Sequence, residues 1–381
     1  YMFFLKPENK FNLKLQSPSK SFWSTFKKAF LTKKNFKKYW NNLDKSSLPK
    51  ELVNLTTIFV NSKSYIEVSK FWRHIAITHF KGLSHAADKE TQNSIIHADY
   101  VSCTFFNKEN FNSLKNLDLN NFLNKHNVFT KHKNLTEHDS ISYNIATIIY
   151  FLKKKNLINK YYNLINKSFY EDFSHTLQID GLNINQHLMY SLNELEKINI
   201  LVDNKENNLK VLEFGAGYGR TANMLLSIKK NTKYIIVDIP PSLYVSTLRL
   251  RKHYPNLKIF HAFDIHEKDK LKEAINENDI IYIFPHQLAI LEENYFDLAI
   301  MIGVINEMEP KNIKNYMNYV NKITKNLYMK VFKYSGLPFS FYKFYSYNKR
   351  KDYYISNNWK EIFSENSLES DQIYHLGYKI K

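Results

Sequence analysis

The chain has 381 residues, a formal net charge of +18 and one cysteine, Cys103. This length can bury a full core in one large domain with an extension, or in two domains, whereas a single cysteine excludes a disulfide framework and a cysteine-based zinc site. The charge comes mostly from lysine, and arginine, whose fork suits phosphates and base edges, is scarce. We therefore expect no nucleic-acid partner.

The first forty residues combine many lysines with many aromatic residues. Phe22, Phe26 and Phe30 recur at helical spacing with lysines on the other faces, so this segment either packs on its own domain or makes a peripheral contact with a membrane surface. The opening run, residues 1–5, is too short for a signal peptide, and no apolar run is long enough to span a membrane. We expect a cytoplasmic protein.

Helical spacing dominates up to residue 170, and only Leu55–Val60 shows strand-like alternation. Helices are expected over Tyr65–Phe80, Asn112–Asn124, Ser140–Lys153 and Leu157–Tyr170. Residues 1–170 should therefore form a mainly helical region that caps a cofactor domain, shapes a substrate cleft or supports oligomerisation. A clearer helix over Ile184–Ile198 leads into the expected second domain, residues 171–381.

Three of the eight glycines lie within five residues, between an apolar strand over Leu209–Phe214 and a helix over Thr221–Ile228. The candidate binding residues of this segment are Glu213, Gly215, Ala216, Gly217, Tyr218, Gly219 and Arg220. Glycine adopts a positive φ at low cost and has no Cβ, so the backbone can approach a ligand closely. We therefore interpret the loop as a ligand cradle rather than as a tight turn without a ligand.

The spacing Glu-x-Gly-x-Gly-x-Gly resembles the first motif of class I S-adenosylmethionine-dependent methyltransferases. A dinucleotide fingerprint would place its third glycine where Arg220 stands, which disfavours a nicotinamide oxidoreductase. The resemblance implies S-adenosyl-L-methionine as the cofactor, with its methionine part over the glycine loop and Glu213 holding its amino group. Tyr218 and Arg220 flank the loop and are candidate contacts to the cofactor or the substrate.

After residue 209 apolar strands alternate with helices, which predicts a doubly wound, Rossmann-like α/β sheet. Strands are expected over Tyr234–Ile239, Leu257–Phe263, Ile280–Phe284, Asp297–Val304, Leu327–Phe332 and Gln372–Ile380, the last antiparallel, and helices over Ser242–Tyr254 and Asn312–Thr324. One of the strands expected between Asp238 and Asp297 has no assigned place in this sheet.

Polar residues at the strand ends are candidates for holding the rest of the cofactor. Asp238 ends the second strand, where a carboxylate can accept two hydroxyl hydrogen bonds from a ribose, and Ile239 is placed to lie along an adenine face. The adenine amino group should meet either Asp264 or the turn Pro285-His286-Gln287, and we favour the turn.

The expected strand that ends at Val304 leads into the turn Asn306-Glu307-Met308. A hydroxyl that accepts a methyl group must lose its proton to a base, because its own pKa lies far above neutral. Glu307 is the first candidate for this catalytic base and His286 the second. Alternatively, Glu307 caps the next helix or orients substrate hydroxyls, and His286 is an ordinary loop histidine. We expect no metal site, because histidines and acids do not recur at a metal-binding spacing.

Three segments occur in the order typical of the sugar O-methyltransferase family, which this chain resembles over roughly residues 175 to 335. They are Glu213–Arg220, Tyr234–Tyr244 with its Asp-x-Pro strand end, and Asn306-Glu307-Met308. The resemblance implies O-methylation of a sugar or glycan acceptor in the biosynthesis of a surface glycan such as capsule or lipopolysaccharide. The lead into the Glu-Met turn, residues 303–306, departs from the serine-rich pattern of that family.

Two other functions compete with this one. A nucleic-acid methyltransferase, for example one acting on RNA, is favoured by the charge, but its base-holding Asp/Asn-Pro-Pro-aromatic turn follows the fourth strand. Here Asp-x-Pro-Pro, residues 238–241, follows the second strand, and residues 306–309 are Asn-Glu-Met-Glu. A non-catalytic glycan-binding protein would not need the loop, the strand acid and the carboxylate at Glu307 together.

Overall fold

The computed structural model describes residues 33–62, 76, 80, 117–128, 137–171, 176–305, 308, 310–332, 353–368 and 373–381. The chain divides into two compact units, residues 1–103 and 104–381. The predicted N-terminal helix with Phe22, Phe26 and Phe30, and most of the predicted helix Tyr65–Phe80, lie outside the described residues. The predicted domain boundary at residue 170 stays a prediction.

The described part of the first unit contains α2 (Lys33–Asn42) and α3 (Lys50–Asn61). The strand-like alternation over residues 55–60 lies inside α3, so the expectation of a strand there is wrong. The buried residues Leu52, Leu55 and Phe59 recur at intervals of three and four, which is the period of one helix face. A short apolar stretch can fit both the period of a helix and that of a strand, and here the packing of the buried side chains favours the helix.

In the second unit, several helices and a two-stranded hairpin precede the sheet. They are α8 (Leu117–Lys125), α9 (Glu137–Lys154), α10 (Leu157–Tyr161), the 3-10 helix η1 (Lys167–Tyr170), β1 (Thr176–Ile179), β2 (Leu182–Asn185) and α11 (Gln186–Leu201). The Asn185 side chain accepts a hydrogen bond from the Leu188 N–H at 2.9 Å and so caps α11. Because Ile184 belongs to β2, α11 begins two residues later than predicted.

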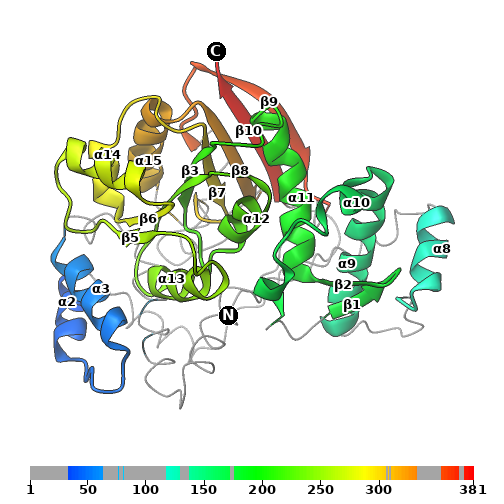
Figure 1. Ribbon diagram of the computed structural model, residues 1–381, viewed down its shortest axis with the longest axis horizontal. Helices are drawn as coiled ribbons and strands as arrows, with labels where there is room; N and C mark the ends of the chain where they lie inside the picture. The colour runs from blue at the N-terminus through cyan, green and yellow to red at the C-terminus, as the bar shows by residue number, and fades with distance from the viewer. Residues whose placement is uncertain are drawn as a thin grey trace, which may run out of the picture. The chain divides into compact units, whose positions relative to one another are not determined.

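Eight strands form one sheet in the order β5-β6-β4-β3-β7-β8-β10-β9 (Figure 1). Their bounds are β3 (Lys210–Phe214), β4 (Lys233–Val237), β5 (Ile259–His261), β6 (Ile280–Ile283), β7 (Leu298–Ile302), β8 (Asn326–Phe332), β9 (Trp359–Asn366) and β10 (Ile373–Ile380). Strands β3 to β8 are parallel, whereas β10 is antiparallel to both β8 and β9. This arrangement confirms the predicted Rossmann-like α/β fold.

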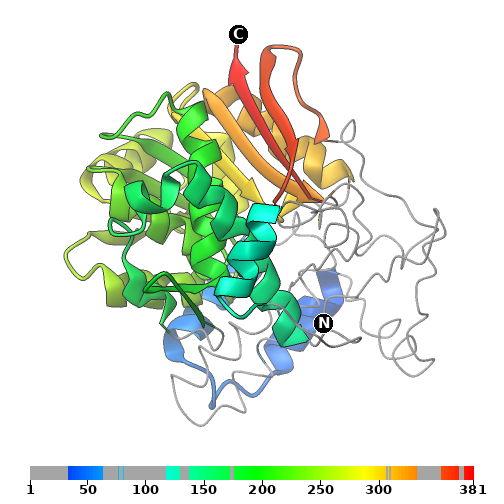
Figure 2. The same cartoon turned by 90° about the vertical axis from the view of Figure 1, so that its right-hand side faces the viewer.

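The sequence analysis left one outer strand of the sheet without a place and missed the other. The strand without an assigned place between Asp238 and Asp297 is β5, which pairs with β6 at one edge of the sheet. The unpredicted β9 lies at the other edge, beside β10 (Figure 2). Most residues of β9 are exposed or half-buried, so an edge strand of this kind lacks the apolar pattern that identifies a strand in a sequence.

Helices cover both faces of the sheet, as in a doubly wound fold. On one face, strand residues such as Leu212 and Met329 form a core with α14 (Lys268–Glu277) and α15 (Pro310–Ile323). The opposite face carries α11, α12 (Arg220–Ile228) and α13 (Ser242–His253) (Figure 1). Side chains alternate along each strand, so Tyr328 and Lys330, on either side of Met329, point to this second face.

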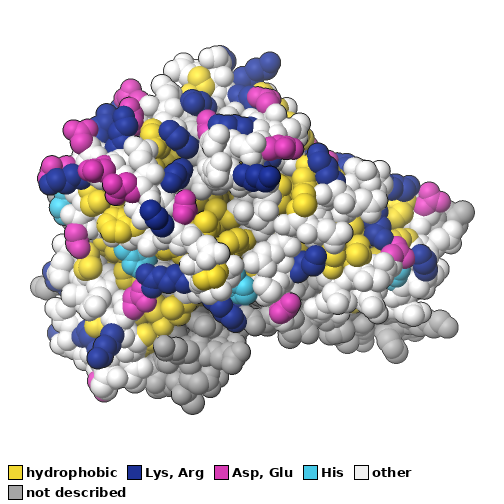
Figure 3. All heavy atoms as spheres, in the orientation of Figure 1, with side chains coloured by type: hydrophobic (Ala, Val, Ile, Leu, Met, Phe, Trp, Pro, Cys, Tyr) yellow, Lys and Arg dark blue, Asp and Glu magenta, His cyan; other side chains and the backbone are white. Residues whose placement is uncertain are grey.

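Basic side chains are spread over the face of the molecule seen in Figure 3, with acidic side chains among them. On this face the high positive charge of the chain is therefore not gathered into one patch. None of the helices in the described ranges is both long enough and apolar enough to cross a membrane.

Candidate cofactor site at the carboxyl ends of the strands

The glycine loop joins β3 to α12 at the carboxyl edge of the sheet. Gly215, Gly217 and Gly219 all have positive φ, at +68°, +58° and +91°. A Cβ added to Gly215 would lie 2.7 Å from Cγ2 of Val304, a residue just beyond β7. The loop therefore needs glycine for its backbone conformation and, at Gly215, for its close approach to the neighbouring strand end.

Asp238 lies directly after β4 and faces the glycine loop. One carboxylate oxygen accepts a hydrogen bond from the Gly217 N–H at 3.2 Å, and the other accepts one from the Ile239 N–H at 2.8 Å. Burial raises the pKa of Asp238 to about 7, although these two backbone hydrogen bonds act in the opposite direction. Each oxygen can still accept a further hydrogen bond, as a ribose diol requires.

Glu213 is buried on β3, on the sheet face that carries α11 and α12. The Tyr234 hydroxyl of β4 donates a hydrogen bond to its carboxylate at 2.7 Å. Burial raises the pKa of Glu213 to about 7, while the hydrogen bonds from Tyr234 and Thr221 and the charge of Arg220 lower it. An ammonium group placed nearby would favour the ionised form of this carboxyl.

Tyr218 points away from the loop and into the protein. Its ring is stacked on that of Phe169 with the centroids 5.9 Å apart, and its hydroxyl lies 2.8 Å from Nδ1 of His187. Ala216 and Ile239 are also nearly buried, each with 8% of its surface exposed. The cofactor contacts predicted for Tyr218, Ala216 and Ile239 stay predictions, and for Tyr218 the visible role is to anchor the loop.

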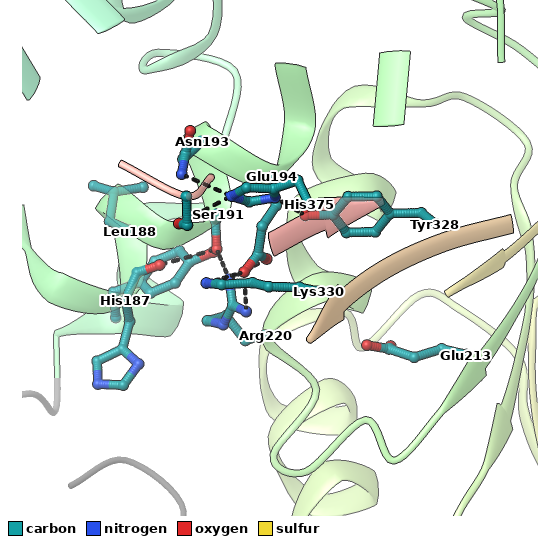
Figure 4. A network of polar contacts seen from close by, with 12 residues as sticks. His187, Leu188, Ser191, Asn193, Glu194, Glu213, Arg220, Tyr328, Lys330 and His375 are labelled. Carbon is teal, nitrogen blue, oxygen red and sulfur yellow. Dashed lines mark hydrogen bonds and ion pairs between the residues drawn. The ribbon is translucent and has the colours of Figure 1, made fainter. Parts of the chain in front are cut away.

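Arg220, the first residue of α12, forms an ion pair with a buried acid that the sequence analysis did not single out. Its guanidinium lies 2.7 and 2.9 Å from the two carboxylate oxygens of Glu194 on α11, and Nζ of Lys330 on β8 lies 3.0 Å from the same carboxylate (Figure 4). Burial alone would raise the pKa of Glu194, but the two cations outweigh it and lower the pKa to about 2.

The turn after β6 contains the residues that we expected to meet adenine. Pro285 is buried, and the buried Gln287 side chain accepts from the Phe284 N–H at 2.8 Å and donates to the Ala262 and Ile265 carbonyls at 2.6 and 2.8 Å. This amide already ties the turns after β5 and β6 together, so the geometry does not favour its side chain as a direct adenine ligand.

His286 and Asp264 remain as more accessible groups at this edge. His286 is half-buried, and its ring centroid lies 5.9 Å from that of the exposed His266, while Asp264 is exposed. Glu307, the first candidate for the base, and its neighbour Asn306 lie outside the described residues. In the described part of the chain, no group of three or more histidine, cysteine or acidic side chains is arranged to hold a metal ion.

No protein-family model and no curated protein matches the chain. Among solved structures, the PH0226 protein from Pyrococcus horikoshii OT3 is 13% identical, with a TM-score of 0.35, and the match covers 51% of this chain and 92% of that one. The bifunctional kinase-methyltransferase WbdD is 14% identical, with a TM-score of 0.34, over 49% of this chain and 39% of its own. An rRNA methylase from Escherichia coli is 12% identical, with a TM-score of 0.32, over 87% and 100% of the two chains. Similarity at this level carries no conclusion about activity.

The presence of an rRNA methylase among these structures corrects one expectation. The prediction that nucleic acid is excluded as a partner is wrong. That prediction rested on the scarcity of arginine, a residue that recognises bases. The fold itself does not determine the substrate, and it is compatible with nucleic acid.

The sequence analysis missed Glu194, Lys330 and His187, which the structure places beside the glycine loop. Glu194 and His187 belong to α11, a helix buried on nearly all sides because α9, α12 and the sheet all pack against it. A polar residue on such a helix has no periodic signal that separates a buried position from an exposed one. Lys330 lies within an apolar strand, and that break in the strand pattern was the available signal.

Replacing Gly215 by alanine is expected to lower the free energy of unfolding by about 2 to 4 kcal/mol, because it adds a clash with Val304 to the cost of a positive φ. Gly181→Ala is the matched control, since Gly181 also has a positive φ, +78°, but no heavy atom within 4 Å of an added Cβ. It should lose about 1 to 2 kcal/mol in urea unfolding. Equal losses in the two variants would contradict the close approach at Gly215.

Glu213→Gln is expected to change how stability depends on pH. In the folded protein the pKa of Glu213 is raised from 4.5 to about 7, so the folded state binds the proton more tightly and the free energy of unfolding falls as pH rises through this window. Glutamine can still accept from Tyr234 but does not titrate. The stability of the variant relative to the wild type should therefore rise by about 3 kcal/mol between about pH 4.5 and pH 7. A pH-independent difference in urea unfolding would show that the Glu213 carboxyl titrates normally.

Proposed function

We propose that this protein is an S-adenosylmethionine-dependent O-methyltransferase that acts on a sugar hydroxyl, in the biosynthesis of a surface glycan. The observation that carries the proposal is Asp238, a carboxylate at the end of β4 that is fixed by the N–H of Gly217 in the glycine loop. A strand-end acid next to such a loop suits a ligand that combines a ribose diol with a polar chain.

The residues present fit the cofactor. Asp238 retains hydrogen-bonding capacity for the ribose hydroxyls, and the glycine loop leaves its backbone open to the ligand. Glu213 can hold an amino group from below the loop, and His286 lies at the next strand end, where adenine would be reached. When bound, S-adenosylmethionine supplies a methyl group on a positively charged sulfur. The protein contributes mainly by positioning an acceptor oxygen in line with it.

A base next to the acceptor would take the hydroxyl proton as the new oxygen–carbon bond forms. Glu307 is our first candidate and His286 the second. The support for Glu307 is its place in the sequence, in the turn after β7, since β7 lies next to β3 in the sheet. The sugar acceptor is supported by the resemblance of the sequence segments to sugar O-methyltransferases.

Calorimetric titration with S-adenosylhomocysteine tests the cofactor site. Wild type should bind, and Asp238→Asn should weaken binding by about 10- to 100-fold, because a charged acceptor for the ribose hydroxyls is lost. Asp279→Asn is the matched control: Asp279 precedes β6 at the amino edge of the sheet, where its carboxylate accepts from the Lys258 N–H at 2.9 Å. Absence of binding by folded wild type would overturn the proposal.

Methyl transfer to a panel of nucleotide sugars and glycans, with RNA assayed in parallel, tests the acceptor. Mass spectrometry should detect a methylated sugar, and Glu307→Gln should lower the turnover rate by about 10²- to 10⁴-fold while leaving S-adenosylhomocysteine binding unchanged. Methylation of RNA without methylation of any sugar would overturn the sugar acceptor and leave the cofactor site standing.

A further inference from the structure

Glu194, Arg220 and Lys330 form a buried cluster with more positive than negative charge. The carboxylate side chain of Glu194 is fully buried, whereas the side chains of Arg220 and Lys330 keep 12% and 9% of their surface exposed. One acid and two bases sum to one positive charge. An anion is therefore attracted to this cluster, in which the two cations are the less deeply buried side chains.

The cluster lies beside the glycine loop and on the same side of the sheet as Glu213. Glu213 is opposite Ile300 of β7, and Ile300 is opposite Tyr328, so Lys330 stands two residues nearer the carboxyl end of β8. The Lys330 carbonyl also accepts a hydrogen bond from the Gly303 N–H at 2.9 Å, at the turn after β7. Figure 4 shows the Glu213 carboxylate directed toward the side where Arg220 and Lys330 lie.

An acid and a pair of cations on the same side of the sheet suit the two charges of an α-amino acid. The ammonium group would lie toward Glu213, and the carboxylate toward the cations, because charge-assisted hydrogen bonds to a carboxylate are strong and guanidinium provides parallel donors. We propose that Arg220 and Lys330, held in place by Glu194, bind the carboxylate of the amino-acid part of the cofactor. This inference rests on the proposed function and assigns a ligand group to Lys330.

Glu194 acts here as a positioning residue. Its two carboxylate oxygens engage both cations, Ser191 accepts a further hydrogen bond from Arg220 at 3.1 Å, and Nζ of Lys330 lies 4.5 Å from the ring centroid of Tyr190. All three partners belong to α11, so one helix fixes both long side chains. Two flexible cations that are fixed before binding lose less conformational freedom when the ligand arrives.

The test compares two ligands by calorimetric titration. One is S-adenosylhomocysteine and the other is its analogue in which hydrogen replaces the amino-acid carboxylate. Wild type should bind the intact ligand about 10- to 100-fold more tightly, and Lys330→Met should reduce this ratio to about threefold or less, chiefly by weakening the intact ligand. Lys330→Arg keeps the charge and should retain the preference. Lys325→Met is the matched control, because Lys325 lies one residue before β8, 3.4 Å from Asp297, with an exposed side chain.

The outcomes separate this inference from the proposed function. If wild type binds both ligands equally well, or if folded Lys330→Met weakens both by the same factor, the carboxylate site is overturned and the cofactor site stands. If wild type binds neither ligand, the proposed function is overturned and the inference with it. The wild-type comparison needs no substitution, so equal binding of the two ligands overturns the carboxylate site even if Lys330→Met does not fold.

Discussion

A single buried carboxylate, Glu194, connects the parts of the molecule that form the candidate site. Glu194 lies on α11, the helix that precedes the sheet. It pairs with Arg220, the first residue of α12, and with Lys330 near the end of β8. A carboxylate without exposed surface is costly to bury alone, and one that lost a single partner would leave a charge poorly compensated. Separating α11, α12 or β8 from the others would leave a buried charge without its partner, so this ion pair network holds the three elements together.

The geometry of parallel strands determines where chemistry can occur in this fold. All carboxyl ends of β3 to β8 meet at one edge, and the side chains that follow them converge there from segments far apart in the sequence. Gly215 shows how closely they approach, since its missing Cβ leaves room for Val304 from the next strand. Tyr218 and Gln287 also bring these segments together, because the buried side chain of each one forms hydrogen bonds that fix a loop.

Much of the sheet could be predicted from its sequence, because buried parallel strands such as β3 and β4 are continuous apolar runs that begin and end sharply. The glycine loop and Asp238 were recognisable for the same reason: they follow those runs directly. The ion pair at Arg220 could not be predicted, because its partner Glu194 lies 26 positions earlier on a helix that is buried on nearly all sides. An ion pair between distant segments produces no periodic pattern in the sequence of either segment. Outer strands such as β9 also escape, since their exposed side chains do not alternate.

The order of strands in the sheet has a consequence for how the chain is made. Each outermost strand precedes in the sequence the strand that it pairs with: β5 pairs with β6, and β9 pairs with β10. A chain emerging from the ribosome therefore exposes each of these segments before its partner exists. Because β10 inserts between β8 and β9, a chain truncated before Ile373 would leave β8 with an open edge and β9 without a partner strand in this sheet.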